Sequence, residues 1–163
     1  MSDREHMANQ SSRAEQRNLA NQRSRGRSLA VQALYQWQIS ETDSGDLLNQ
    51  FHADETMDGA DREYFDALVR GCLAEAASLR ALYDAHLDRP EVQLDPVERA
   101  IMLVAVYELR ERIDVPWRVV LNEAVSLARR FGAEESHRYI NAVLDRVARE
   151  LRPAEMQSGG NSR

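Results

Sequence analysis

The sequence is poor in residues that interrupt helices: its 163 residues include only seven glycines and four prolines. So few turn-forming residues favour long helices with short connections over a protein built from many strands. Cys72 is the only cysteine, which excludes an internal disulfide and any zinc site made of several thiolates. Its apolar neighbours at helical spacing predict an ordinary core position for this thiol.

Long hydrophobic runs are absent too, since no apolar stretch approaches the roughly 20 residues that a membrane-spanning helix needs. Residues 1–19 are polar and lack the apolar centre of a signal peptide. We therefore expect a soluble, cytoplasmic protein that makes no membrane contact.

The motifs of several enzyme classes are missing from the sequence. It has no glycine-rich phosphate loop, no Gly-x-Ser-x-Gly nucleophile motif and no His-Glu-x-x-His metal pair. By elimination, the sequence predicts a protein that is not an enzyme and that uses neither a metal nor a cofactor.

Charge is distributed unevenly along the chain. The whole chain has a formal charge of −6. Residues 1–30 carry +3 of it, so the remaining residues carry −9. A basic arm on an acidic body suggests phosphates as partners of the arm and a basic protein as partner of the body, although both can also be merely solvated surface. Because residues 1–22 are low in apolar side chains, we expect them to be disordered, like the tail at 154–163.

Between these ends, apolar residues recur at three- and four-residue steps, which predicts an all-α protein of six to seven helices. The sequence Asp95-Pro96 is an N-cap followed by a proline at the first helical position, and Gly132 suits a left-handed residue after a helix. We expect two packed three-helix subdomains, residues 23–90 and 91–153. The expected helices are 25–40, 45–53, 61–87, one that begins at Asp95-Pro96, 116–132 and 134–151.

Several segments share their order and spacing with one protein family. They are AVQALYQW at 30–37, YF at 64–65 followed by Gly71, VERA at 97–100, YEL at 107–109, VP at 115–116, LNEAV at 121–125, FG at 131–132 and YINAVLD at 139–145. Together they resemble the NusB family of transcription antitermination factors. The resemblance covers residues 23–153, which we take as the NusB-like domain.

The resemblance implies a fold of two three-helix bundles and a function in transcription. It implies binding to the boxA element of nascent ribosomal RNA leader transcripts, together with the small-subunit ribosomal protein NusE, within an RNA polymerase antitermination complex. The alternative that we keep is a helical protein-interaction module, as a monomer or a homodimer, that has no functional RNA binding.

The resemblance also implies site residues. Tyr35 and Tyr139 would stack RNA bases, and the boundary position of both rings on their helices agrees with that role. Glu98 falls at a family position that contacts NusE, where an acidic surface would suit a basic ribosomal protein. The remaining predicted RNA contacts are Arg23, Arg25 and Arg27 to phosphates, Gln32 and Gln36 to bases, and Glu135 and Ser136 one turn before Tyr139.

Overall fold

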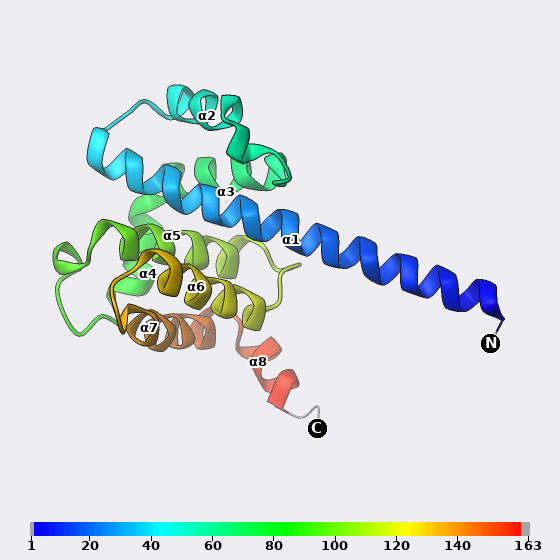
Figure 1. Cartoon of the computed structure of the whole chain (residues 1–163). Helices are drawn as coiled ribbons and strands as arrows, with labels where there is room; N and C mark the ends of the chain where they lie inside the picture. Colours follow the sequence, from blue (N-terminus) through cyan, green and yellow to red (C-terminus); the bar gives the residue numbers. More distant parts are fainter. Residues whose placement is uncertain (1, 161–163) are drawn as a thin grey trace.

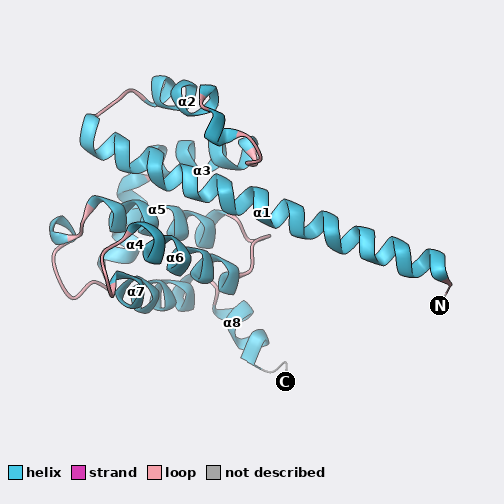
Figure 2. Cartoon of the chain, in the orientation of Figure 1, coloured by secondary structure: helices cyan, strands magenta, loops and turns pink. Residues whose placement is uncertain are grey.

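The computed structural model describes residues 2–160, and within that range every regular element is a helix (Figure 2). The expected all-α class is therefore confirmed. Two 3-10 helices, Glu55–Met57 and Glu91–Gln93, lie in the connections. The eight α-helices are α1 (Asp3–Ser40), α2 (Ser44–Ala53), α3 (Arg62–Ala74), α4 (Ala76–Asp84), α5 (Pro96–Glu111), α6 (Trp117–Phe131), α7 (Ser136–Leu151) and α8 (Pro153–Gly160).

The first helix differs from the expectation of a disordered arm, because the residues before Arg25 continue α1 far beyond the bundle (Figure 1). A capping box between Ser2 and Glu5 closes its amino end, and residues 2–21 are exposed. A low apolar content prevents a segment from packing, but it does not prevent a helix. Residues 3–22 are rich in Ala, Gln, Arg and Glu, which favour a helix, and they only extend one that the bundle has already nucleated.

The first half of the chain packs around the carboxyl-terminal part of α1. α2 and α3 pack against α1 and against each other, and the backbone N–H of Asp61 donates to the Gln22 carbonyl (3.0 Å). The single helix expected over 61–87 is two helices, because the chain turns at Glu75 (φ −114°, ψ 20°). The apolar periodicity runs on through this turn, so no local pattern predicts it.

The most apolar helix, α5, is the centre of the fold. It packs against α1, α3 and α4 on one side and against α6 and α7 on the other. Its start confirms the prediction: the Asp95 side chain accepts from the Val97 backbone N–H (2.9 Å), Pro96 occupies the first helical position, and Glu98 completes a capping box. Because α5 joins both halves in one continuous hydrophobic cluster, the proposed division at residue 90 stays a prediction.

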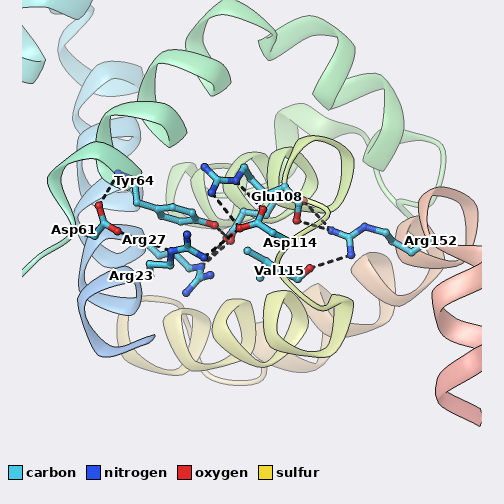
Figure 3. A network of polar contacts seen from close by, with 9 residues as sticks. Arg23, Arg27, Asp61, Tyr64, Glu108, Asp114, Val115 and Arg152 are labelled. Atoms are coloured by element: carbon cyan, nitrogen blue, oxygen red, sulfur yellow. Dashed lines mark hydrogen bonds and ion pairs between the residues drawn. The ribbon is translucent and has the colours of Figure 1, made fainter. Parts of the chain in front are cut away.

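The carboxyl end of α5 is closed by a residue from much later in the chain. The buried Arg152 guanidinium donates to the carbonyls of Glu108 and Leu109 and to two carbonyls of the following loop, those of Arg112 and Val115, at 2.7–3.1 Å (Figure 3). These include acceptors that the last turn of a helix leaves without a partner. Glu155 of α8 accepts from the same guanidinium at 2.5 Å, so α8 is tied to this point.

Two expectations about the carboxyl-terminal half were wrong. Gly132 is extended (φ −85°, ψ 172°) and not left-handed; a Cβ there would lie 2.7 Å from the Ala128 carbonyl oxygen, which explains the glycine by close approach. The expected disordered tail is helical as far as Gly160, while residues 161–163 lie outside the described range. No helix in residues 2–160 is both long and apolar enough to cross a membrane.

Candidate nucleic-acid interface

One face of α1 borders two adjoining hollows on the surface of the bundle. Arg25, Ser28, Gln32 and Tyr35 lie on this face because they follow one another at three- and four-residue steps. Gln32 lines both hollows, so they meet along α1. We call the first the apolar hollow, the second the polar hollow, and the two together the α1 groove.

The apolar hollow, about 490 Å³ in volume, presents an exposed aromatic ring. The Tyr35 side chain is 41% exposed, and the hollow beside it is walled by Ile39, Phe51, Val97 and Phe131. An accessible tyrosine next to an apolar depression is the kind of surface on which an unstacked nucleic-acid base binds. The structure thus leaves Tyr35 available for its predicted role.

Gln32 and Gln36 flank Tyr35 at the edge of the same hollow, as the helical spacing predicts. The Gln32 amide donates to the Ser28 carbonyl (3.3 Å), and Gln36 exchanges hydrogen bonds with Gln50 of α2 (2.9 Å for the shorter). Both side chains are at least partly exposed, so a base edge can replace these local partners.

The polar hollow, about 510 Å³, lies between α1 and α6 and contains two arginines. Arg25 donates to the Thr56 carbonyl (3.2 Å) and Arg130 donates to the Ser28 hydroxyl (3.3 Å). Within the described residues neither guanidinium has a carboxylate at ion-pair distance, because Glu123, which also lines the hollow, pairs with Arg27 instead. Two uncompensated positive charges at a concave surface suit an RNA phosphate.

Arg130 is a site candidate that the sequence analysis missed. It is one of two consecutive arginines in the last turn of α6, and nothing in the sequence separates it from Arg129. Only the packing of α6 beside α1 brings Arg130 to the hollow.

The predicted phosphate contact of Arg27 is wrong. Its side chain is 3% exposed, and its Nε donates to both carboxylate oxygens of Glu108 on α5 (2.8 and 2.9 Å). The Tyr64 hydroxyl donates to the same carboxylate (Figure 3). Burial lowers the pKa of Arg27, but the hydrogen bond and charge of Glu108 outweigh burial and leave that pKa raised. A guanidinium held in this way is part of the core and does not reach a phosphate.

Arg23 is only half-buried, but it is also engaged within the protein. It forms ion pairs with Asp114 (3.3 Å) and Asp61 (3.9 Å), and its guanidinium lies 4.7 Å from the centre of the Tyr64 ring. A phosphate at this position would have to compete with two carboxylates. Of the three arginines predicted at this site, the structure therefore leaves Arg25 the most available.

Tyr139 lies on α7, beside the loop that precedes α5. Its hydroxyl accepts from the Asp88 backbone N–H (3.3 Å), and the Arg89 guanidinium lies 4.4 Å from the ring centre. Burial is the main cause that raises the Tyr139 pKa above its ordinary value. Because Arg89 covers one face of this half-buried ring, a base would stack on the other face or displace Arg89.

The two predicted residues before Tyr139, Glu135 and Ser136, differ in their exposure. Glu135 is exposed, has a positive φ of 70° and pairs with Arg138 (3.0 Å). Ser136 is buried, and its hydroxyl donates to Glu98 (3.4 Å), which gives this serine a structural contact in place of an open surface.

Glu98 thereby links the starts of two helices. One carboxylate oxygen accepts from the Asp95 backbone N–H (3.2 Å) and the other from Ser136. Its neighbour Val97 lines the apolar hollow, so the first turn of α5 connects the Tyr35 surface with the start of α7. Tyr35, Ser136 and Tyr139 thus lie near Glu98 at the amino end of α5, whereas Arg23 and Arg27 pair with Asp114 and Glu108 near its carboxyl end.

Residues 24–149 match the sequence model of the NusB family. The chain belongs to the NusB family. Among curated members, it is 46% identical over 136 residues to the transcription antitermination protein NusB of Marinomonas sp. (strain MWYL1), covering 82% of this chain and 78% of that protein. It is also 46% identical over 136 residues to NusB of Paraburkholderia phymatum, covering 83% and 94%.

Solved NusB structures have the same fold. The structure of Thermotoga maritima NusB superposes with a TM-score of 0.72 at 28% identity, covering 83% of this chain and 96% of that one. A crystal structure of the antitermination factors NusB and NusE in complex with double-stranded RNA gives a TM-score of 0.67 at 21% identity, covering 78% and 96%. The family match begins at residue 24, so most of the protruding part of α1 lies outside it.

Proposed function

We propose that this chain is a transcription antitermination factor that binds boxA RNA of ribosomal RNA leader transcripts together with ribosomal protein NusE. The observation that carries the proposal is the α1 groove, in which an exposed tyrosine beside an apolar hollow adjoins two arginines that have no carboxylate of residues 2–160 at ion-pair distance. The curated relatives are named as transcription antitermination proteins, so we assign the chain no catalytic role. We place it in the cytoplasm, within the RNA polymerase antitermination complex.

The groove divides RNA recognition between its two hollows. One base would stack on Tyr35, with Gln32 and Gln36 offering amides to base edges. The neighbouring phosphates would bind Arg25 and Arg130, which fix the register of the strand without reading its sequence. Tyr139 and the exposed Glu135 would extend the contact beyond the first turn of α5.

The charge of the body supports a basic protein as second partner. The chain outside residues 1–30 has a formal charge of −9, and Glu98 is a half-buried carboxylate at the same end of the bundle as Tyr35. Complementary charge speeds the encounter with a basic ribosomal protein and orients it. RNA and NusE would then bind adjacent surfaces and strengthen each other's binding.

The test is binding of a boxA oligonucleotide at about 50 and about 200 mM salt, with and without NusE. We expect affinity to fall with salt and to rise with NusE. Tyr35→Ala should weaken RNA binding by about 1–3 kcal/mol, the usual loss for one stacked base. Tyr35→Phe keeps the ring and should bind like the unaltered chain.

Val119→Ala, an exposed apolar position on α6 that lines neither hollow, is the matched control. Full RNA affinity in a folded Tyr35→Ala protein would remove Tyr35 from the site. Binding of NusE without any binding of RNA would leave a protein-interaction module in place of the adaptor.

A further inference from the structure

The stripe of α1 that borders the polar hollow continues into the protruding arm, which we define as residues 3–21. Arg13, Arg17, Asn21 and Arg25 follow one another at four-residue steps on one continuous helix, and Asn21 and Arg25 line the hollow. Arg17 also precedes Tyr35 by five whole turns, which places it on the Tyr35 face at a distance of about 27 Å along the axis. The arm therefore continues this side of α1 beyond the end of the α1 groove.

Arg13 and Arg17 are exposed, and no carboxylate of the described residues is at ion-pair distance from either. Glu15 lies two residues from each of them, and a step of two residues turns a helix by about 200° to the far side. The arm is neutral as a whole, with three arginines and three acidic residues, but its two central arginines share one side. The exposed positive charge of α1 thus continues outward from Arg25, while carboxylates of the protein neutralise Arg23 and Arg27.

We propose that the arm is a second RNA-contact surface, which binds the sugar–phosphate backbone of the single-stranded RNA flanking the segment held in the α1 groove. This inference rests on the proposed function and extends it to a part of the chain outside the family match. Arginines on a polar helix bind phosphates through charge alone, so the contact does not depend on the flanking sequence. The arm lengthens the RNA footprint and does not change which element is recognised.

The composition of the arm argues against a protein as its partner. Its only large exposed apolar side chains among the described residues are Met7 (68% exposed) and Leu19 (46%). A helix that pairs with another helix needs an apolar residue at every three- or four-residue step, and these two are twelve residues apart. The arm has no such seam, whereas phosphates require none.

The experiment compares three RNAs: a core oligonucleotide limited to the boxA element, one lengthened at the 5′ end and one lengthened at the 3′ end with unstructured sequence. The unaltered chain should bind one lengthened RNA more tightly than the core. The salt slope is the steepness with which the logarithm of affinity falls as the logarithm of salt concentration rises, and each lost phosphate contact lowers it by about 0.7 for single strands. The Arg13→Ala/Arg17→Ala chain should therefore show a slope smaller by about 1.4 on that RNA. Between about 50 and about 200 mM salt, its affinity should then fall by a factor about sevenfold smaller than that of the unaltered chain.

A second variant tests whether the side of α1 on which the two arginines lie matters, in addition to their charge. Exchanging Ser12 with Arg13 and Gln16 with Arg17 (Ser12→Arg, Arg13→Ser, Gln16→Arg, Arg17→Gln) keeps composition and net charge. It turns both arginines by about 100°, toward the side of α1 where Gln16 lines a different hollow with Asp114. Like the alanine variant, this variant should bind the lengthened RNA no more tightly than the core oligonucleotide, and it should keep full affinity for the core.

Equal affinity of the unaltered chain for core and lengthened RNAs would overturn the role of the arm while leaving the proposed function intact. If the exchanged variant still binds the lengthened RNA more tightly than the core, the Arg13 and Arg17 side of the arm is not the contact surface. Failure of the unaltered chain to bind even the core would instead overturn the proposed function, and the arm proposal with it.

Discussion

Arg25 and Arg27 stand two residues apart on α1, and the fold gives them opposite tasks. Arg25 is exposed at the polar hollow and donates to the Thr56 carbonyl, whereas Arg27 lies in the core between α1 and α5 with Glu108 and Tyr64. In the sequence they are two members of one basic segment. The comparison shows that the positive charge of a segment becomes a binding surface only where the fold supplies no carboxylate to neutralise it.

The strongest way to test this contrast is to remove each arginine in turn. Arg27→Ala should destabilise the protein by about 3–5 kcal/mol, because it leaves the Glu108 carboxylate buried without its counter-charge. Arg25→Ala should change the free energy of unfolding by no more than about 0.5 kcal/mol, as is usual at an exposed position. Urea denaturation followed by circular dichroism measures both.

Replacing the whole buried group is the control for that experiment. The chain with Arg27→Met, Glu108→Leu and Tyr64→Phe leaves no orphaned polar group, so it should be clearly more stable than Arg27→Ala alone. Similar losses for Arg25→Ala and Arg27→Ala would contradict the distinction between the two arginines.

A second, smaller effect concerns alkaline pH. Burial, followed by the Glu108 charge, raises the pKa of Tyr64 above its ordinary value of 10.0. Above that value an unfolded tyrosine loses its proton while the folded one keeps it, so stability falls as pH rises. Tyr64→Phe should reduce this fall by up to about 1.4 kcal/mol per pH unit, in urea unfolding curves recorded between about pH 9.5 and 11. An unchanged slope would mean that Tyr64 is not buried against Glu108 in solution.

The smallest expected effects concern RNA binding and leave the fold untouched. Arg25→Ala and Arg130→Ala should each lower the salt slope of RNA binding by about 0.7, the value for one phosphate contact on a single strand. Arg23→Ala should lower it less, because Asp61 and Asp114 already hold that side chain. A larger change from Arg23 than from Arg25 would reverse the order of availability that the structure gives.

The sequence predicted the elements whose signals are local. The Asp95-Pro96 start of α5 and the apolar faces of α5 to α7 could be predicted from the sequence because capping and periodicity act over a few residues. The turn at Glu75 could not be predicted, since no Gly or Pro marks it. The helical arm was missed because low apolar content excludes packing but says little about a helix that a folded neighbour prolongs.

The candidate site was predictable in the same uneven way. Tyr35 could be found because an aromatic ring at the edge of an apolar face is visible in the sequence itself. The burial of Arg27 and the arrival of Arg130 at the polar hollow depend on partners 81 and 102 residues away, Glu108 and Ser28 respectively. Contacts over such separations follow from the packing of helices, which no local pattern contains.

Arg152 has a consequence for the order in which the chain folds during synthesis. The end of α5 and the loop after it depend on a guanidinium that leaves the ribosome some forty residues later than the carbonyls it binds. Until then α5 can pack against α1 and α3, but the Leu109 carbonyl in its last turn lacks the guanidinium that binds it. The nascent bundle is therefore completed from its carboxyl end, and a chain that stops at Leu151 would lack the residue that closes it.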